Sequence, residues 1–218
     1  MKADYAHIHV ILDRSGSMQS IRDDVVGSFN SYVEQQKQGP GMVTLSLIQF
    51  DSQDPYEVVY DFKSLGETPQ LTVATYVPRA NTPLLDALGR GMADLEGRLG
   101  KLGEDNRPEH IFFVIITDGM ENASCEYQRT QIEEMIKERT EKEKWEFVYL
   151  SADLGAIHEA RHMGIAQDKS LFFDKSGQGV RQAMASASDR MLEKRRHEKQ
   201  AFGFIKEDRK KSEEEETS

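Results

Sequence analysis

One segment of the chain is apolar over almost its whole length, and it restricts the possible folds more than any other. Within residues 109–117 the sequence is His110-Ile111-Phe112-Phe113-Val114-Ile115-Ile116. A strand with one solvent-facing side alternates polar and apolar residues, whereas this segment offers apolar side chains on both sides. The pattern therefore predicts a central parallel strand that helices cover on both faces.

Segments with strand and helix periodicity alternate along the rest of the chain. Strands are expected at residues 6–12, 43–50, 56–62, 109–117, 145–151 and 170–174, and helices at 20–38, 83–99, 130–143, 154–163 and 177–198. Only a short turn separates the second and third strands, so this pair is expected to be antiparallel and to lie at an edge. The other connections contain helices and require right-handed crossovers. The predicted fold class is α/β: a doubly wound, mostly parallel six-stranded sheet with one antiparallel edge strand and helices on both faces, as in Rossmann-like folds.

The composition limits the kinds of partner. The formal net charge of −10 argues against non-specific binding to nucleic acid or to an acidic membrane surface. No apolar stretch approaches the length of a membrane span, and the first residues lack a signal region, so a cytoplasmic protein is expected. Cys125 is the only cysteine, which excludes an internal disulfide. One domain is predicted over residues 1–200, followed by a polar acidic C-terminal tail over 201–218 that is expected to be disordered.

Side chains with oxygen atoms follow two of the predicted strands and precede one helix. Asp13, Ser15 and Ser17 come directly after the first strand, Asp118 follows the central strand, and Thr82 precedes the second helix. Open α/β sheets bind ligands beyond the carboxyl ends of their strands, at the point where the strand order reverses. If the first and the central strand are neighbours, the three loops converge on one site.

These five side chains have the chemistry of a magnesium site. Mg²⁺ prefers about six oxygen ligands in octahedral geometry and gives up its waters reluctantly. The hydroxyls of Ser15, Ser17 and Thr82 can bind it directly, and Asp13 and Asp118 can bind it directly or through water. Because so many of the ligands are neutral, the ion keeps part of its charge, and an open coordination position attracts an external carboxylate.

At these residues the chain resembles the von Willebrand factor A-type domain family, which includes the integrin inserted domains. The metal-ion-dependent adhesion site (MIDAS) of that family consists of Asp-x-Ser-x-Ser, a distant Thr and a distant Asp, which Asp13, Ser15, Ser17, Thr82 and Asp118 match in order. In the family the Thr often follows two glycines, whereas here it follows Ala-Asn. The resemblance covers nearly the whole chain. The segment after the fifth strand is also similar to stand-alone bacterial and phage members.

The resemblance implies a non-catalytic module that binds proteins through Mg²⁺, with Mn²⁺ or Ca²⁺ as possible substitutes. Ser15, Ser17 and Thr82 would contact the metal, Asp13 and Asp118 would act mainly through water, and an Asp or Glu of a protein partner would complete the coordination shell. In some relatives ligand binding is coupled to movement of the last helix, which gives the hypothesis that the helix predicted at 177–198 switches.

Other functions remain as alternatives. His158-Glu159-Ala160-Arg161-His162 has the H-E-x-x-H pattern of zinc peptidases, in which two histidines one helical turn apart bind zinc and the glutamate acts as a base. Coincidence is the favoured interpretation, since the predicted helix is short and no third ligand is evident. A metal-assisted hydrolase that uses Asp13 and Asp118, or a regulatory subunit of a larger complex, is also possible.

The acidic tail suggests one further hypothesis. Glu213 to Glu216 carry the carboxylates that an open metal position attracts, so the tail could occupy the site of its own chain or of a neighbouring copy. A tail that only increases solubility is the favoured interpretation.

Overall fold

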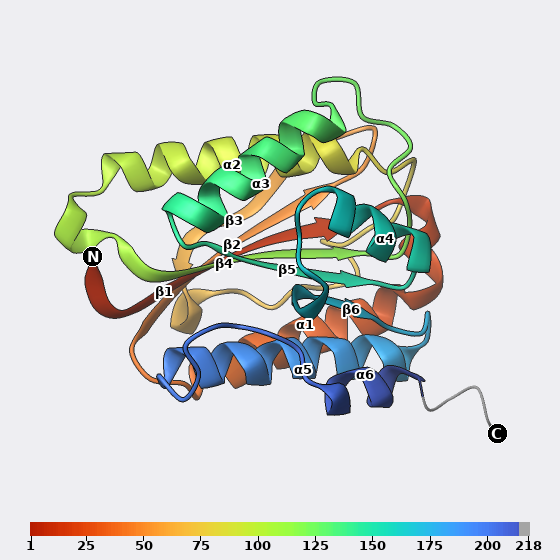
Figure 1. The fold of residues 1–218 in the computed structure, drawn as a ribbon. Coiled ribbons are helices and arrows are strands. Elements are labelled where there is room, and N and C mark those ends of the chain that lie inside the picture. Colours follow the sequence, from red (N-terminus) through yellow and green to blue (C-terminus); the bar gives the residue numbers. More distant parts are fainter. Residues whose placement is uncertain (214–218) are drawn as a thin grey trace.

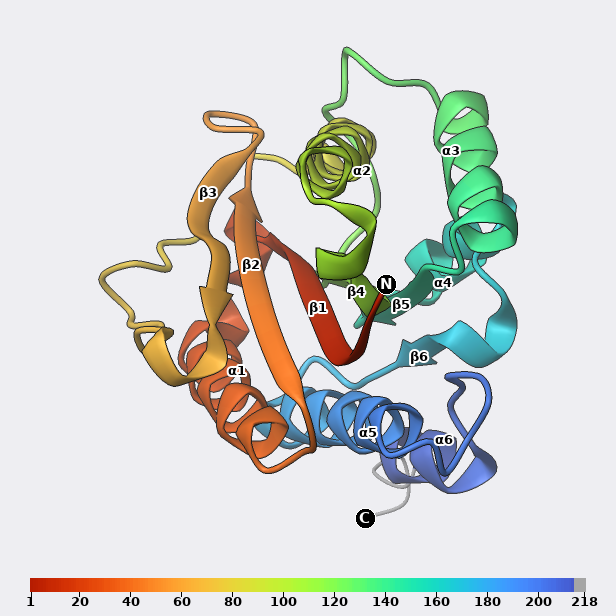
Figure 2. The ribbon, with the colours of Figure 1, turned by 90° about the vertical axis from the view of Figure 1, so that its left-hand side faces the viewer.

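A single mixed sheet of six strands lies at the centre of the computed structural model, which describes residues 1–213 and the side chains of residues 1–210 (Figures 1 and 2). The strand order is β3-β2-β1-β4-β5-β6, in which only the β2–β3 pair is antiparallel. The strands are β1 (Lys2–Asp13), β2 (Met42–Phe50), β3 (Glu57–Ser64), β4 (Pro108–Thr117), β5 (Glu146–Ser151) and β6 (Ser170–Phe172). The predicted fold class, including the antiparallel edge strand, is confirmed.

Helices cover both faces of the sheet. One face packs against α2, α3 and α4, and the other packs against α1 and α5, with α6 beside α5 (Figure 1). The helices are α1 (Arg22–Lys37), α2 (Leu84–Lys101), α3 (Arg129–Lys142), α4 (Leu154–His162), α5 (Gly177–Arg195) and α6 (Lys206–Glu213). Because the central strands are covered on both sides, they are apolar on both sides, as the sequence of β4 predicted.

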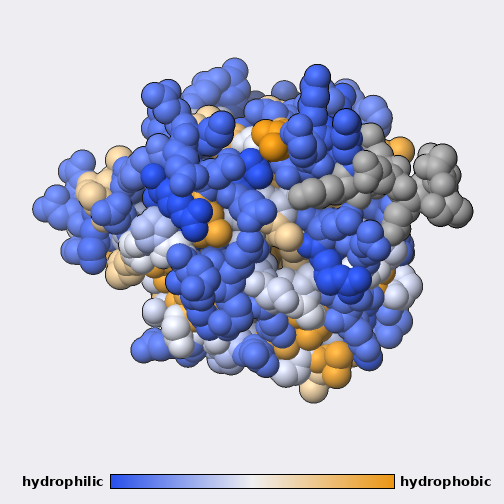
Figure 3. All heavy atoms as spheres, turned by 90° about the horizontal axis from the view of Figure 1, so that it is seen from below, coloured by the Kyte–Doolittle hydropathy of each residue, from blue (hydrophilic) through white to orange (hydrophobic). Residues whose placement is uncertain are grey.

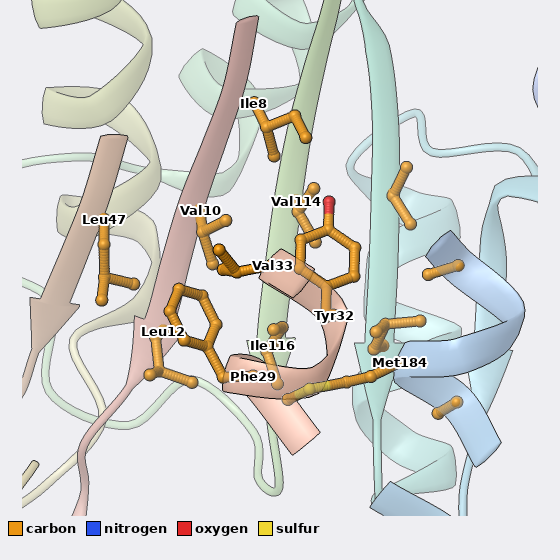
Figure 4. Packing of buried hydrophobic residues seen from close by; sticks show 14 of the residues in the cluster. Ile8, Val10, Leu12, Phe29, Tyr32, Val33, Leu47, Val114, Ile116 and Met184 are labelled. Carbon is orange, nitrogen blue, oxygen red and sulfur yellow. The ribbon is translucent and has the colours of Figure 1, made fainter. Parts of the chain in front are cut away.

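In the core on the α1–α5 face, side chains that alternate along a strand pack against side chains from one face of a helix. Ile8, Val10 and Leu12 alternate along β1 and point to the same side, where Phe29 and Tyr32 of α1 contact them (Figure 4). All of these side chains are buried, and a fully buried side chain of this size contributes about 1.5–3 kcal/mol through the hydrophobic effect. This packing fixes β1, and therefore the position of the residues that follow it.

The strand register brings the predicted site together. β1 lies between β2 and β4, with Leu12 beside Ile116 and Asp13 beside Phe50. The parallel strands therefore end together, at a side of the molecule that we call the carboxyl end of the sheet; the opposite side, where they begin, is the amino end. The reversal of strand order lies between β1 and β4, so the loops after these two strands leave the sheet side by side.

Several predicted boundaries differ from the structure by one to four residues, and β1, for example, begins four residues earlier than predicted. Two differences have a clear physical cause. The first helix does not begin at residue 20, because Gly16–Ile21 form a 3-10 turn and α1 follows it. The predicted disordered tail, 201–218, is corrected over 201–213: Phe202 and Phe204 are buried in the core, with exposed fractions of 1% and 6%, and α6 follows them. These two aromatic side chains supply the apolar area that the polar composition of the segment concealed. Residues 214–218, which contain most of the acidic run, lie outside the described residues.

The surface over α1, α5 and α6 is mostly hydrophilic and carries only small hydrophobic patches (Figure 3). Among the described residues, no helix is long and apolar enough to cross a membrane.

Candidate metal centre

Asp13 is fully buried at the end of β1, and each of its carboxylate oxygens accepts a hydrogen bond. The backbone N–H of Ser15 donates to Oδ1 over 2.6 Å, and the hydroxyl of Thr117 donates to Oδ2 over 2.6 Å. The hydroxyl of Tyr76 donates to the backbone carbonyl of Asp13, also over 2.6 Å. Asp13 is therefore held in one orientation by the loop that follows it, by the neighbouring strand and by the loop before α2.

A chain of short hydrogen bonds links three more of the predicted residues. The hydroxyls of Ser15 and Ser17 lie 3.0 Å apart, and the Ser17 hydroxyl donates to Asp118 Oδ1 over 2.6 Å. Ser17 is carried by the 3-10 turn that precedes α1, and Asp118 follows the last residue of β4. Two loops separated by a hundred residues in sequence thus meet at one group of oxygen atoms, and Ser17 is at the surface.

Thr82 lies beside this group and is positioned through its backbone. Its N–H donates to Asn122 Oδ1 over 2.9 Å, and its carbonyl accepts the N–H of Asn122 over 3.1 Å. On the other side, the N–H of Gly16 donates to the carbonyl of Ala80 over 3.0 Å. The loop of Thr82 therefore lies between the loops that follow β1 and β4. In the described chain, the Thr82 hydroxyl forms no hydrogen bond with the other four residues.

Two carboxylates share the site, and they differ in their surroundings. Burial raises the pKa of Asp13 to about 6, and the nearby charge of Asp118 acts in the same direction. The side chain of Asp118 is also buried, but its Oδ2 lies 2.6 Å from the ammonium of Lys175, without the geometry of a hydrogen bond. The proximity of two negative charges favours the approach of a cation, and the buried surroundings screen this attraction only weakly.

Lys175 has no counterpart in the predicted site. It lies in the loop between β6 and α5 and is about one-third exposed, with 38% of its side chain accessible. Nothing in the local sequence distinguishes it from other surface lysines, because only the packing of α5 against the sheet places this loop above the end of β4. Thr117 and Tyr76 were also missed as partners of Asp13, because only the fold brings the end of β4 and the loop before α2 beside the end of β1.

Arg14, which interrupts the Asp-x-Ser-x-Ser motif, points away from the oxygen atoms. It is buried, and its guanidinium lies 2.7–2.8 Å from Asp51 Oδ2 and also contacts Glu57. Its carbonyl accepts the N–H of Arg79 over 2.9 Å. These contacts join the loop after β1 to the end of β2 and the start of β3, so Arg14 stabilises the loop without contacting the hydroxyls of the motif.

The donor set fits a small, hard cation. Hydroxyl and carboxylate oxygens are the ligands that Mg²⁺ and Mn²⁺ prefer, and the buried Oδ2 of Asp118, which accepts no hydrogen bond, has an unused acceptor capacity. No nitrogen or sulfur ligand is among the five residues. Asp13, Ser15, Ser17, Thr82 and Asp118 are therefore suited to hold such an ion, directly or through water.

The H-E-x-x-H segment lies on α4, where His158 and His162 are exposed. Glu159 forms an ion pair with Arg129 over 2.7 Å. Up to residue 210, no group of three metal-ligating side chains includes these two histidines. Among these residues, the segment thus lacks the third protein ligand that a catalytic zinc site requires.

No protein-family model matches the sequence, and no curated protein sequence matches it. Solved structures do match the fold. The pilus adhesin SpaC from Lactobacillus rhamnosus GG, in its open conformation, aligns with a TM-score of 0.66 and 14% identity, over 88% of this chain and 30% of its own. A von Willebrand factor type A structure from Catenulispora acidiphila aligns with a TM-score of 0.59 and 12% identity, over 87% and 43%.

A third match is proximal thread matrix protein 1 from the mussel byssus, in a structure with a zinc-occupied MIDAS motif. It aligns with a TM-score of 0.60 and 14% identity, over 87% of this chain and 46% of its own. The chain thus spans less than half the length of each of these three structures. At such low identity the matches show the fold alone, and this fold is that of a von Willebrand factor A-type domain.

Proposed function

We propose that the chain is a non-catalytic, divalent-cation-dependent module that binds a protein partner. The metal is Mg²⁺, or Mn²⁺ or Ca²⁺ in its place, and the partner supplies an Asp or Glu carboxylate. The residues that hold the metal are Asp13, Ser15, Ser17, Thr82 and Asp118. The observation that carries the proposal is the continuous chain from Asp13 through Ser15 and Ser17 to Asp118, which gathers hard oxygen ligands from two loops at one surface.

Each of these residues has a role that follows from its contacts. Asp13 is held by Ser15 and Thr117 on both of its oxygens, so it orients the loop and interacts with an ion mainly through its charge. The hydroxyls of Ser15 and Ser17 lie 3.0 Å apart, which is close to the separation of two adjacent ligands in an octahedral Mg²⁺ shell, about 2.9 Å. Asp118 supplies the second negative charge, which Lys175 partly neutralises.

The charge balance explains why such a site would bind an acidic partner. A cation held mainly by neutral hydroxyls supplies attraction for an external carboxylate. The chain offers two carboxylates at the site and one ammonium, so it contributes a formal charge of about −1 near a divalent ion. The similar structures support this interpretation, since one of them is a pilus adhesin and another has a metal-occupied MIDAS motif.

The surroundings of the site are suited to a protein partner. Three of the large apolar side chains that are exposed in the described residues lie at the carboxyl end: Val77 and Met120 in loops and Leu154 at the start of α4, with exposed fractions of 47%, 43% and 60%. Exposed apolar side chains next to a polar anchor are typical of protein-binding surfaces, in which methionine is enriched. A partner with apolar residues beside its acidic side chain would match this surface.

The test is capture of partners from cell extract with the full chain, in the presence of Mg²⁺ or of a chelator. Ser17→Ala should lose the partners that wild type retains, and calorimetry with Mn²⁺ should show at least a tenfold loss of affinity. The matched control is Ser20→Ala, since Ser20 is exposed on the same turn and its hydroxyl contacts only the Ser17 carbonyl, over 3.5 Å. Partner binding that resists both the chelator and Ser17→Ala would contradict the proposal and favour a regulatory subunit, and metal-dependent turnover lost in Ser17→Ala would favour a hydrolase.

A further inference from the structure

A second group of potential metal ligands lies at the amino end of the sheet, on the opposite side from the site described above. Glu109, His110 and His197 each offer a ligand atom, and these three atoms lie within 4.8 Å of one another. Glu109 and His110 belong to the first residues of β4, and His197 follows the end of α5. His110 and His197 are 87 positions apart in sequence, so this group is created by the packing of α5 against the sheet.

The two histidine rings face each other, and one ring nitrogen of His110 has no hydrogen-bond partner. Their ring centroids are 5.8 Å apart, and the rings are tilted by 56°. The Nε2 atom of His110 is shielded from solvent and forms no hydrogen bond with any described residue. A buried polar atom without a partner costs free energy, and a neutral imidazole nitrogen can satisfy itself by donating its lone pair to a metal ion.

A fourth side chain, from β1, completes the group. Asp4 Oδ1 lies 3.6 Å from His197 Nε2, and the N–H of Asp4 donates to Glu109 Oε2 over 3.0 Å. Asp4 and His197 both adopt left-handed backbone conformations, with φ values of 55° and 58°. Such conformations are uncommon for residues other than glycine, although asparagine, aspartate and histidine adopt them more often than most.

Two imidazoles and a carboxylate form the ligand set of a zinc site with one open or water-filled position. Tetrahedral ligands at normal zinc distances are about 3.3 Å apart, so the atoms here need to approach one another by at most about 1.5 Å. His197 is exposed and can supply this movement by rotation of its side chain.

We propose that Glu109, His110 and His197 form a zinc site, with Asp4 or water as the fourth ligand. The site is distinct from the oxygen-rich group at the carboxyl end and does not depend on the function proposed for that group. It would join the first residues of β4 to the end of α5, and thus fix the C-terminal end of the longest helix on the sheet. The expected ligand is Zn²⁺, or Co²⁺ as a spectroscopic substitute, and not Mg²⁺, because imidazole suits the former ions.

The experiment measures zinc stoichiometry and cobalt absorption with the full chain and the metal salts alone. All variants are made in wild type and in an Asp118→Asn background, which removes zinc binding at the carboxyl end. In both backgrounds, the double variant His110→Asn, His197→Asn should lose one equivalent of zinc and the absorption of four-coordinate Co²⁺. Zinc at a hundredfold excess over its Kd should also raise the Tm of wild type by roughly 5–10 °C, and this increase should disappear in the double variant.

The control is His158→Asn, His162→Asn, which removes the exposed pair on α4 and should retain the zinc and the cobalt absorption. The single variant His197→Asn keeps the test valid if the half-buried His110 is needed for folding, because asparagine tolerates a positive φ. An unchanged zinc stoichiometry in His197→Asn and in the double variant would overturn the proposal. So would a loss of zinc in the α4 control alone.

Discussion

The two ends of the sheet hold two groups of potential metal ligands that differ in chemistry and in degree of preorganisation. At the carboxyl end, Asp13 and Asp118 are buried, and short hydrogen bonds fix the hydroxyls between them. At the amino end, His110 is half-buried, His197 is exposed, and few hydrogen bonds restrain either ring. The first group is ready for a hard cation with little movement, whereas the second requires a side-chain rotation.

The difference follows from how the chain arrives at each end. Loops that leave parallel strands can form hydrogen bonds with one another, and here the loop of Thr82 is bound on both sides by its neighbours. At the amino end, the histidines come from a strand and from the end of a helix, which meet only through packing. We therefore expect metal binding at the carboxyl end to cost little conformational free energy, whereas binding at the amino end requires the ligands to be brought together first.

The largest effect that we predict is a pH dependence of the free energy of unfolding, and it arises in β1, the strand that joins the two ends of the sheet. His9 is fully buried and stacks on Phe113, and burial lowers its pKa to about 3. The unfolded chain takes up this proton near pH 6.5 and the folded chain does not, so acid favours unfolding. Between pH 7 and pH 5, His9 should lower the free energy of unfolding by about 2 kcal/mol.

Denaturant unfolding at the two pH values measures this effect. His9→Leu should lose about 2 kcal/mol of the pH dependence, whereas His158→Leu, at an exposed position on α4, should keep all of it. An unchanged dependence in His9→Leu would contradict this prediction and place the acid sensitivity at another group, such as His7, which is also buried in β1 and whose pKa burial also lowers.

The second largest effect concerns the ammonium group of Lys175 at the carboxyl end and its influence on metal affinity. Lys175→Met removes the ammonium that lies 2.6 Å from Asp118, so a divalent ion no longer meets repulsion there. The affinity for Mn²⁺ should rise about tenfold, or about 1.4 kcal/mol, in calorimetry. The control Lys63→Met changes an exposed lysine of β3 and should leave the affinity unchanged. A weaker affinity in Lys175→Met would show that the lysine supports the site.

The Lys175 contact also bears on the hypothesis that the last helix switches. Lys175 immediately precedes Ser176, the N-cap of α5, whose hydroxyl accepts the N–H of Gly179 over 3.1 Å. Displacement of the ammonium by a metal would therefore act on the beginning of α5, while zinc at the amino end would act on its end. Hydrogen exchange of α5 with Mn²⁺ and with Zn²⁺ separates these two influences.

The smallest effect is expected from backbone strain at the carboxyl end. Ala80 adopts a φ of 57°, a conformation that glycine reaches without a steric penalty. Ala80→Gly should therefore raise the free energy of unfolding by about 0.5 kcal/mol, since relief of the strain exceeds the added entropy of the unfolded chain. Thermal unfolding measures this change. A destabilised variant would show that the methyl group of Ala80 contributes more packing than the strained conformation costs.

Much of the fold followed from local patterns. The apolar run in β4 predicted a central strand, and the short turn before β3 predicted its antiparallel pairing, which the structure confirms. The C-terminal segment was harder, because Phe202 and Phe204 are two apolar residues in a polar stretch and contribute only through contact with a distant core. The start of α1 also differed, since a 3-10 turn and an α-helix have similar periodicities over six residues.

The sequence by itself determined the layers of the fold and the candidate oxygen ligands, because strand and helix periodicity and the spacing of Asp13, Ser15 and Ser17 are local properties. Only the tertiary structure decided that Lys175 lies against Asp118 and that His110 meets His197. These contacts join segments far apart in the chain, and they depend on where many weak packing interactions place α5. No local pattern encodes that sum, so the first of the two groups of ligands could be predicted and the second could not.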